Sequence, residues 1–309
     1  MGVKIDEVKK LIKNKRSIKD NSLNAYIISL NKLAHELYKD IFDSDQLKMF
    51  AKNKKYLEKL NIHTRKNLVA AIVVSVKSID KFPPNIRGKY EKYMKELIGN
   101  VDKEYSKNKK SDKEKKNWIS YKEIIDKINE LMKLTININK KTDITRKDLD
   151  IFQQLLILSL YTLIPPQRNN FANTIICIKE DECNDNKFNY IILSKKEFVI
   201  NNYKTKKTYG IKKIKLPQNI VNLIKIWVKI NPTHFLLINT TNKTCMKPNG
   251  LTKYLNKIFL PKKVSTTILR KLYLTNKYPI TNSFEEMLKD ADIMGHSVNT
   301  QQSIYRKKD

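Results

Sequence analysis

A histidine and a tyrosine stand nine residues apart in the stretch IMGHSVNTQQSIYRKKD, as His296 and Tyr305. The chain has only four histidines, so this pairing raises the question of shared chemistry. A tyrosine hydroxyl can attack a phosphodiester, and an imidazole can hydrogen-bond an oxygen of the same phosphate. The two residues are therefore candidates for one phosphate site; the alternative is an incidental surface histidine and a core tyrosine.

Arginine is rare in a chain whose basic residues are mostly lysine. A guanidinium holds phosphate through two parallel hydrogen bonds, which an ammonium cannot copy, so an arginine kept against this bias is a candidate phosphate ligand. Arg168 follows the apolar run and the prolines of LIPPQRNNF, and Arg270 lies in STTILRKLYLT, whose apolar neighbours indicate a partly buried helix. Either could instead be a surface or capping arginine. The arginines are Arg16, Arg65, Arg87, Arg146, Arg168, Arg270 and Arg306.

Strand cleavage by a tyrosine needs more than the phenol, whose unperturbed pKa is near 10. Without a metal, fixed cations or hydrogen-bond donors must stabilise the charge that builds on the non-bridging oxygens. The leaving oxygen needs a proton from a general acid. The minimal set is two arginines, a donor such as histidine, a lysine as acid, and the tyrosine. The stretch NNYKTKKTYG lies between the two arginines and offers the lysine.

In this order of residues the chain resembles the tyrosine recombinases, the phage-integrase family. The stretches IPPQRNNF, NNYKTKKTYG and MGHSVNTQQSIY are most similar to recombinases of large DNA viruses and their mobile elements. The resemblance implies that Tyr305 is the nucleophile and forms a 3′-phosphotyrosyl link. It also implies that Arg168, Arg270 and His296 bind the non-bridging oxygens of the cleaved phosphate.

Three further positions follow from the resemblance, and two of them depart from the family pattern. Lys204 best matches the general acid of the family's β-hairpin, with Lys206 and Lys207 as alternatives; each could equally be solvated surface charge. Thr267 stands at the usual histidine of His-x-x-Arg. Its hydroxyl can donate a hydrogen bond to phosphate but cannot serve as a base. Phe171 stands where many members carry a glutamate.

The charge balance points to a polyanionic partner. Lys and Arg number 62 against 31 Asp and Glu, so the net charge is +31. Such an imbalance destabilises a fold through self-repulsion, and nucleic acid is the commonest partner that relieves it. An AT-rich genome would also encode many lysines, so codon bias is the alternative origin of part of the charge. The expected partner is double-stranded DNA.

A membrane, a metal and a cofactor are not expected. No apolar run approaches the roughly 20 residues of a transmembrane helix, and the start MGVKIDEVKK lacks the apolar core of a signal peptide. The three cysteines are scattered without a CxxC, which predicts reduced thiols and no metal site. We expect an intracellular location at DNA, in the host cytoplasm or nucleus if the source is viral. The resemblance implies chemistry without a metal or ATP.

Residues 1–110 are predicted to form a helical DNA-binding domain, similar to the family's core-binding domain. Helices are expected after Asn21-Ser22, from Thr64, and over residues 86–98 beyond the break at FPPN. The helix from Thr64 is apolar nearly all round and should be central. Arg65 and Lys66 at its start would suit DNA phosphates, or could simply mark a helix terminus.

Residues 115–309 are predicted to form the catalytic domain, mainly α with a small antiparallel β-sheet (an α+β fold). The stretch 101–117 lacks apolar periodicity and is expected to be a linker, the solvated end of a helix or a plain surface helix. Helices are predicted in SYKEIIDKINELMKL, LDIFQQLLILSLYTL, VNLIKIWVKI and GLTKYLNKIFL, and from about Thr266. Strands are predicted in NTIICIK, NYIILS, EFVINNYK and GIKKIKLP, with a hairpin turn at Tyr209-Gly210.

The leading functional prediction is a site-specific DNA recombinase or integrase. The resemblance implies four active sites at one synapse, hence a homo-tetramer on DNA. A type IB topoisomerase would use the same residues as a monomer that relaxes supercoils. A non-catalytic DNA-binding relative is the third possibility, and Thr267 and Phe171 keep it open.

Overall fold

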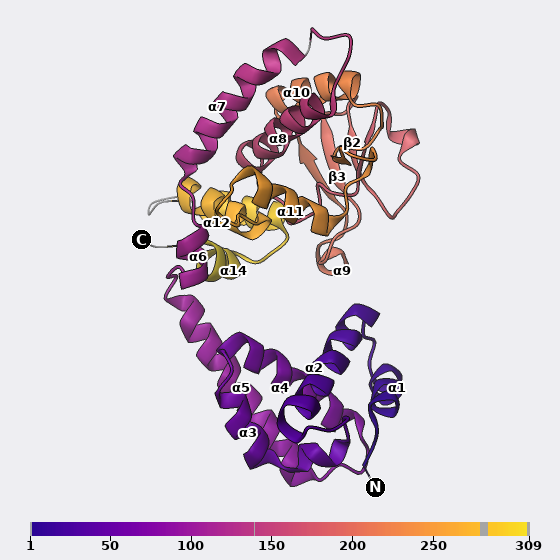
Figure 1. Ribbon diagram of the computed structural model, residues 1–309, viewed down its shortest axis with the longest axis vertical. Helices are drawn as coiled ribbons and strands as arrows, with labels where there is room; N and C mark the ends of the chain where they lie inside the picture. The colour runs from indigo at the N-terminus through magenta and orange to yellow at the C-terminus, as the bar shows by residue number, and fades with distance from the viewer. Residues whose placement is uncertain (1, 139, 279–283, 308–309) are drawn as a thin grey trace. The chain divides into compact units, whose positions relative to one another are not determined.

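The computed structural model describes residues 2–138, 140–278 and 284–307 (Figure 1). The chain divides into two compact units, residues 1–107 and 108–309. This division falls within the stretch 101–117, where the sequence predicts a linker or the end of a helix. Residues 101–106 are in fact the end of a long helix, and Val101 is buried within it.

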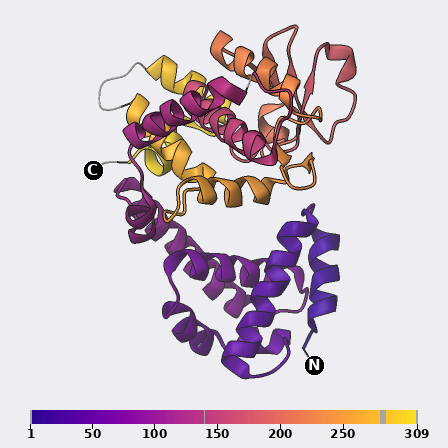
Figure 2. The same ribbon diagram turned by 45° about the horizontal axis from the view of Figure 1, so that its top comes forward.

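The unit 1–107 is a bundle of helices. Its central helix is α4, which packs against α1, α2 and α5, and Figure 2 shows α1 and α2 side by side as the two indigo helices. The bounds are α1 Ile5–Lys15, α2 Asp20–Tyr38, a 3-10 turn Ser44–Lys48, α3 Phe50–Glu58, α4 Ile62–Ser78 and α5 Pro84–Ser106.

The helix ends of this unit differ from the sequence prediction for local reasons. Helix α4 begins at Ile62 rather than Thr64, because the Asn61 side chain accepts a hydrogen bond from the Thr64 amide and caps the helix. Helix α5 begins at Pro84, whose fixed φ suits the first turn. It runs beyond residue 98 because Leu97 and Val101 continue its buried stripe.

The unit 108–309 is built round α8, which is buried along most of its length and packs against α7, α10 and α12. A capping box of Thr145 and Asp148 starts α8, and Pro165-Pro166 follow the C-cap residue Ile164. The helices are α6 Asp112–Asn117, α7 Tyr121–Ile138, α8 Arg146–Leu163, α9 Lys206–Tyr209, α10 Gln218–Ile230, α11 Pro248–Ile258, α12 Thr266–Lys277, α13 Phe284–Met294 and α14 Val298–Thr300.

The main sheet has the strand order β1-β2-β3-β4 and is mixed, so the prediction of an antiparallel sheet is wrong for one pair. Strands β1 and β2 run parallel, because the long connection 178–188 returns the chain to the same end of the sheet. The other two pairs are antiparallel. The strands are β1 Thr174–Cys177, β2 Asn189–Ile192, β3 Glu197–Ile200 and β4 Lys212–Lys215, with a small second sheet of β5 Ile238–Asn239 and β6 Thr244–Cys245.

The β3–β4 connection is longer than the predicted two-residue turn. It spans residues 201–211 and contains the single helical turn α9. Gly210 ends that turn with φ of +67°, a left-handed conformation that favours glycine. The connection carries Lys204, Lys206 and Lys207, the three lysines that the sequence offers as candidates for the general acid. No helix within the described ranges is both long and apolar enough to cross a membrane.

Candidate active site

Arg270 is the structural centre of the candidate site. Its side chain is fully buried on α12 and donates hydrogen bonds to the carbonyls of Pro166 (2.8 Å) and Met294 (3.3 Å). One guanidinium therefore ties the loop after α8 to the turn that carries His296. Its Nε atom is buried without a partner among the residues that the structure describes. A buried donor left unpaired is a place where a ligand oxygen would be stabilised.

Tyr305 lies against this guanidinium and against His296. The Tyr305 and His296 rings stack with centroids 4.9 Å apart and an angle of 23° between their planes. The Arg270 Cζ atom is 4.7 Å from the centroid of the Tyr305 ring. Tyr305 is only 7% exposed. Folding thus brings together three side chains that the sequence separates by up to 35 positions.

The electrostatic surroundings favour ionisation of the Tyr305 hydroxyl. Burial alone would raise the pKa of Tyr305. The positive charges of Arg270 and Arg168, with hydrogen bonds from both side chains, outweigh that effect and bring the pKa below its usual value. A phenol whose pKa is lowered in this way is a better nucleophile near neutral pH.

The turn after α13 places His296. Gly295 has φ of +70°, and a Cβ on it would approach the Thr205 hydroxyl at 3.1 Å, so the turn suits glycine. The His296 Nδ1 atom lies 3.2 Å from the Ser297 carbonyl, which can only accept a hydrogen bond, so Nδ1 carries a proton. The His296 Nε2 atom is buried without a partner among the described residues.

The pKa of His296 is lowered to about 4, first by burial and then by the charge of Arg270, with smaller effects of Arg168 and Lys212. The ring is therefore neutral at pH 7, and Nε2 presents a lone pair. To donate a hydrogen bond to a phosphate oxygen, Nε2 must take up a proton. The negative charge of an arriving phosphate would favour that uptake.

This shift predicts how stability depends on pH. An exposed histidine has a pKa of 6.5, so unfolding takes up a proton between pH 6.5 and about 4. The stability that neutral His296 contributes is fully present above pH 6.5 and is lost as pH falls toward 4. The loss is on the order of 3 kcal/mol.

Replacing the ring tests this pH dependence. In His296→Gln, the free energy of unfolding from urea titrations should fall less between pH 6.5 and 4.5 than in the wild type. Equal pH dependence of the two proteins would show that His296 titrates normally in the folded state.

The residues that follow Tyr305 hold it in place. Residues Gln301–Tyr305 form a π-helical turn, closed by a 2.9 Å hydrogen bond from the Arg306 amide to the Gln301 carbonyl. Such turns are rare and are frequent at functional sites. The Lys307 amide then donates to the Thr275 hydroxyl on α12 at 3.0 Å. The nucleophile candidate is therefore pinned to the same helix that carries Arg270.

Arg168 connects this cluster to an open cavity of about 370 Å³. Arg168 also lies close enough to lower the pKa of Tyr305 and of His296. The loop that carries it is fixed by the Tyr161 hydroxyl, which donates to the Arg168 carbonyl at 2.6 Å. The cavity, called here the Arg168 cavity, is lined by Arg168, Asn169, Asn170, Ala172, Asn173, Asn189, Asn202, Lys204, Pro248, Thr266 and Thr267.

Of the three candidate lysines, the described lining of the Arg168 cavity includes Lys204. Lys206 is turned to Asn201, whose side-chain oxygen accepts a hydrogen bond from its Nζ atom at 2.6 Å. Lys207 is exposed. Thr267, which stands where the resemblance leads one to expect a histidine, also lines the cavity. Arg168, Lys204 and Thr267 thus face one space, and Arg168 links it to Tyr305.

Lys212, the first residue of β4, belongs to the site and was missed by the sequence analysis. Its side chain is 6% exposed, with Nζ 3.5 Å from an Asp292 carboxylate oxygen and 4.8 Å from the centroid of the Tyr209 ring. Burial lowers the pKa of Lys212, although Asp292 opposes the shift. The alternation in KKIKLP places Lys212 on the same strand face as buried Ile214, and that signal could have found it.

The structure assigns Arg65 a role within its own unit. Its Nε atom donates to the Leu57 carbonyl at 2.9 Å, and Nη2 donates to the carbonyls of Glu58 and Leu60. These bonds satisfy the carbonyls at the end of α3, as a helix-terminus arginine would. The alternative interpretation of Arg65 is thereby favoured. The predicted DNA contact in this unit then depends mainly on half-buried Lys66.

Comparison with known proteins adds little. No protein-family model and no curated protein matches the chain. Among solved structures, the chain is similar to one described as the crystal structure of XerA recombinase, at 11% identity and a TM-score of 0.40. The match covers 99% of this chain and 94% of the other. A TM-score of 0.40 is too low to carry an argument about function. The function is therefore inferred from the residues of this chain.

Proposed function

We propose that this chain belongs to the class of enzymes that break and rejoin DNA strands through a covalent tyrosine intermediate. The supporting observation is that the buried side chain of Tyr305 lies beside Arg270, whose Cζ atom is 4.7 Å from the centroid of the ring, and that the charges of Arg270 and Arg168 lower the pKa of Tyr305. His296 stacks on the same ring. Cations placed in this way both activate the phenol and stabilise the charge of a five-coordinate phosphorus.

The residues divide the reaction between them. Tyr305 releases its hydroxyl proton to solvent and attacks phosphorus as the phenolate, a bond forms between the tyrosine oxygen and phosphorus, and the bond from phosphorus to the 5′-oxygen breaks. Arg168 and Arg270 hold the non-bridging oxygens, with hydrogen bonds from Thr267 and from protonated His296. Lys204 gives its proton to the leaving oxygen. A 5′-hydroxyl reverses these steps and rejoins a strand, because the phosphotyrosine bond conserves the energy.

Within this class the particular function proposed is site-specific recombination on double-stranded DNA. It follows from the order Arg168, Lys204, Arg270, His296 and Tyr305 and from the resemblance of their surrounding motifs to tyrosine recombinases. The helical unit 1–107 would serve as a second DNA-binding unit, and four copies would assemble at a synapse. The net charge of +31 fits such a partner.

Covalent trapping tests the class. The protein is incubated with duplexes that contain a nick near the cleavage point, so that the short leaving strand diffuses away. We expect a protein–DNA adduct whose phosphate maps to Tyr305 by peptide mass. If duplexes selected from the source's own genome for binding give no adduct, the chain is a DNA-binding protein and not an enzyme. Relaxation of plasmids that lack a selected site would indicate a topoisomerase.

A sulfur-substituted substrate identifies the general acid. Lys204→Met should slow cleavage by about 10²–10⁴-fold, and a bridging sulfur at the 5′ position should restore the rate, because a thiolate leaves without a proton. Lys212→Met should not be rescued, because Lys212 faces the turn of His296 rather than the Arg168 cavity. Rescue of Lys212→Met instead would transfer the acid role to Lys212. Single-turnover cleavage rates measure both effects.

A further inference from the structure

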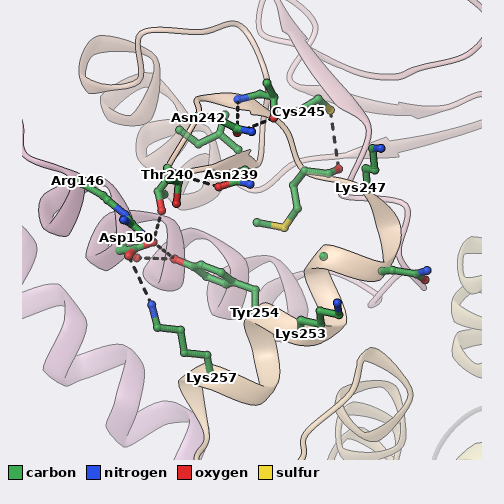
Figure 3. A pocket seen from close by; sticks show the side chains of 16 residues that line it. Arg146, Asp150, Asn239, Thr240, Asn242, Cys245, Lys247, Lys253, Tyr254 and Lys257 are labelled. Carbon is green, nitrogen blue, oxygen red and sulfur yellow. Dashed lines mark hydrogen bonds and ion pairs between the residues drawn. The ribbon is translucent and has the colours of Figure 1, made fainter.

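We propose that a second cavity of the unit 108–309 binds the DNA backbone beside the cleaved phosphate, a role that rests on the function proposed above. This cavity measures about 940 Å³ and lies between the start of α8, the β5–β6 hairpin and α11 (Figure 3). Four cationic side chains and one carboxylate line it, so the lining side chains carry a net charge of +3. The charged residues are Arg146, Asp150, Lys247, Lys253 and Lys257.

This second cavity is called here the Asp150 cavity, after the one carboxylate in its described lining. That carboxylate already has partners within the protein. Asp150 Oδ1 accepts hydrogen bonds from the Thr240 hydroxyl (2.8 Å) and the Tyr254 hydroxyl (3.0 Å). Its Oδ2 atom lies 3.7 Å from the Lys257 Nζ atom. Figure 3 shows these three side chains pointing to Asp150. The carboxylate therefore connects α8, the hairpin and α11.

The other three cationic side chains, unlike Lys257, do not pair with Asp150. Arg146, Lys247 and Lys253 are exposed, and they form no ion pair within residues 2–138, 140–278 and 284–307. Arg146 is also the first residue of α8, where a positive charge opposes the helix dipole and lowers helix stability. An arginine kept at such a place in a lysine-rich chain is explained by a phosphate that it binds in two-pronged fashion.

The Asp150 cavity adjoins the Arg168 cavity through one short segment. Pro248 lines the Arg168 cavity, whereas its neighbours Lys247 and Asn249 line the Asp150 cavity. The Asn173 amide donates a 3.2 Å hydrogen bond to the Met246 carbonyl beside this segment. A strand whose phosphate sits at Arg168 thus continues over this segment. That continuity assigns the cations to neighbouring backbone phosphates rather than to a separate small molecule.

Salt-dependent DNA binding tests the assignment. The variant Arg146→Gln/Lys247→Gln/Lys253→Gln should reduce the slope of log K against log salt concentration by about two to three, because each phosphate that is no longer neutralised lowers the slope by about 0.9. The matched control Lys133→Gln/Lys225→Gln/Lys229→Gln removes three exposed lysines from α7 and α10, outside both cavities. Its slope should change by much less. Equal slopes in the two variants would overturn the assignment.

Neutral phosphates locate the contact. Methylphosphonates placed singly on either side of the cleavage point should weaken wild-type binding at flanking positions where the triple variant is insensitive. Binding of dAMP is measured as well. If the triple variant loses dAMP binding while its salt slope for DNA stays unchanged, the cavity holds a free nucleotide and the assignment fails. If the triple variant does not fold, Lys247→Gln alone must lower the slope by about one. These are binding measurements, so they remain informative if no covalent adduct ever forms.

Discussion

Tyr305→Phe is expected to form no covalent adduct with a nicked duplex and still to bind it with wild-type affinity. The substitution removes the only atom that attacks phosphorus in the proposed reaction. Loss of a covalent nucleophile costs on the order of 10⁶-fold in rate, which is beyond detection in a trapping assay. The phenyl ring keeps the stacking on His296 and the contact with Arg270, so the fold should persist.

Tyr273→Phe is the matched control. Tyr273 is a nearly buried tyrosine of the same cluster, 9% exposed on α12, and its removal leaves the proposed nucleophile untouched. This variant should still give the adduct. An adduct that survives in Tyr305→Phe would move the nucleophile to another residue, and one that both variants abolish would indicate damage to the cluster rather than to the chemistry.

The second large effect is expected at Arg270. In Arg270→Lys the charge remains but the two-pronged geometry is lost, so a single ammonium replaces the separate donors to the Pro166 carbonyl, the Met294 carbonyl and the phosphate. Single-turnover cleavage should fall by about 10²–10³-fold, as for removal of one transition-state donor. The pH at which cleavage is half-maximal should rise if the guanidinium helps to lower the pKa of Tyr305.

Stability and catalysis can be separated at this position. Arg270→Ala leaves two buried carbonyls unpaired, at about 1–3 kcal/mol each, and should lower the free energy of unfolding far more than Arg270→Lys. Arg87→Lys is the control, because Arg87 also donates to backbone carbonyls, of Ile79 and Phe82, but in the unit 1–107. Its cleavage rate should match the wild type. An Arg270→Lys protein that cleaves at the wild-type rate would contradict the assigned role.

Several features of the chain were predictable because their causes are local. Most of the long helices of both units follow from apolar periodicity, and the mainly helical class is confirmed, with a mixed four-stranded sheet and a second two-stranded sheet where one small antiparallel sheet was predicted. The chemistry-bearing candidates could be named because arginine is rare here, and because His296 and Tyr305 are close in sequence. Lys212 also has a local signal, because the alternation in β4 places it on the strand face of buried Ile214.

Long-range packing set the rest, because a residue pattern does not record which distant backbone groups a side chain will meet. The parallel β1–β2 pair depends on how the connection 178–188 crosses the sheet. Arg65 meets the carbonyls at the end of α3, so its guanidinium is used within its own unit. Neutral His296 owes its lowered pKa to burial beside Arg270, a neighbour 26 positions away in the sequence that only folding brings near.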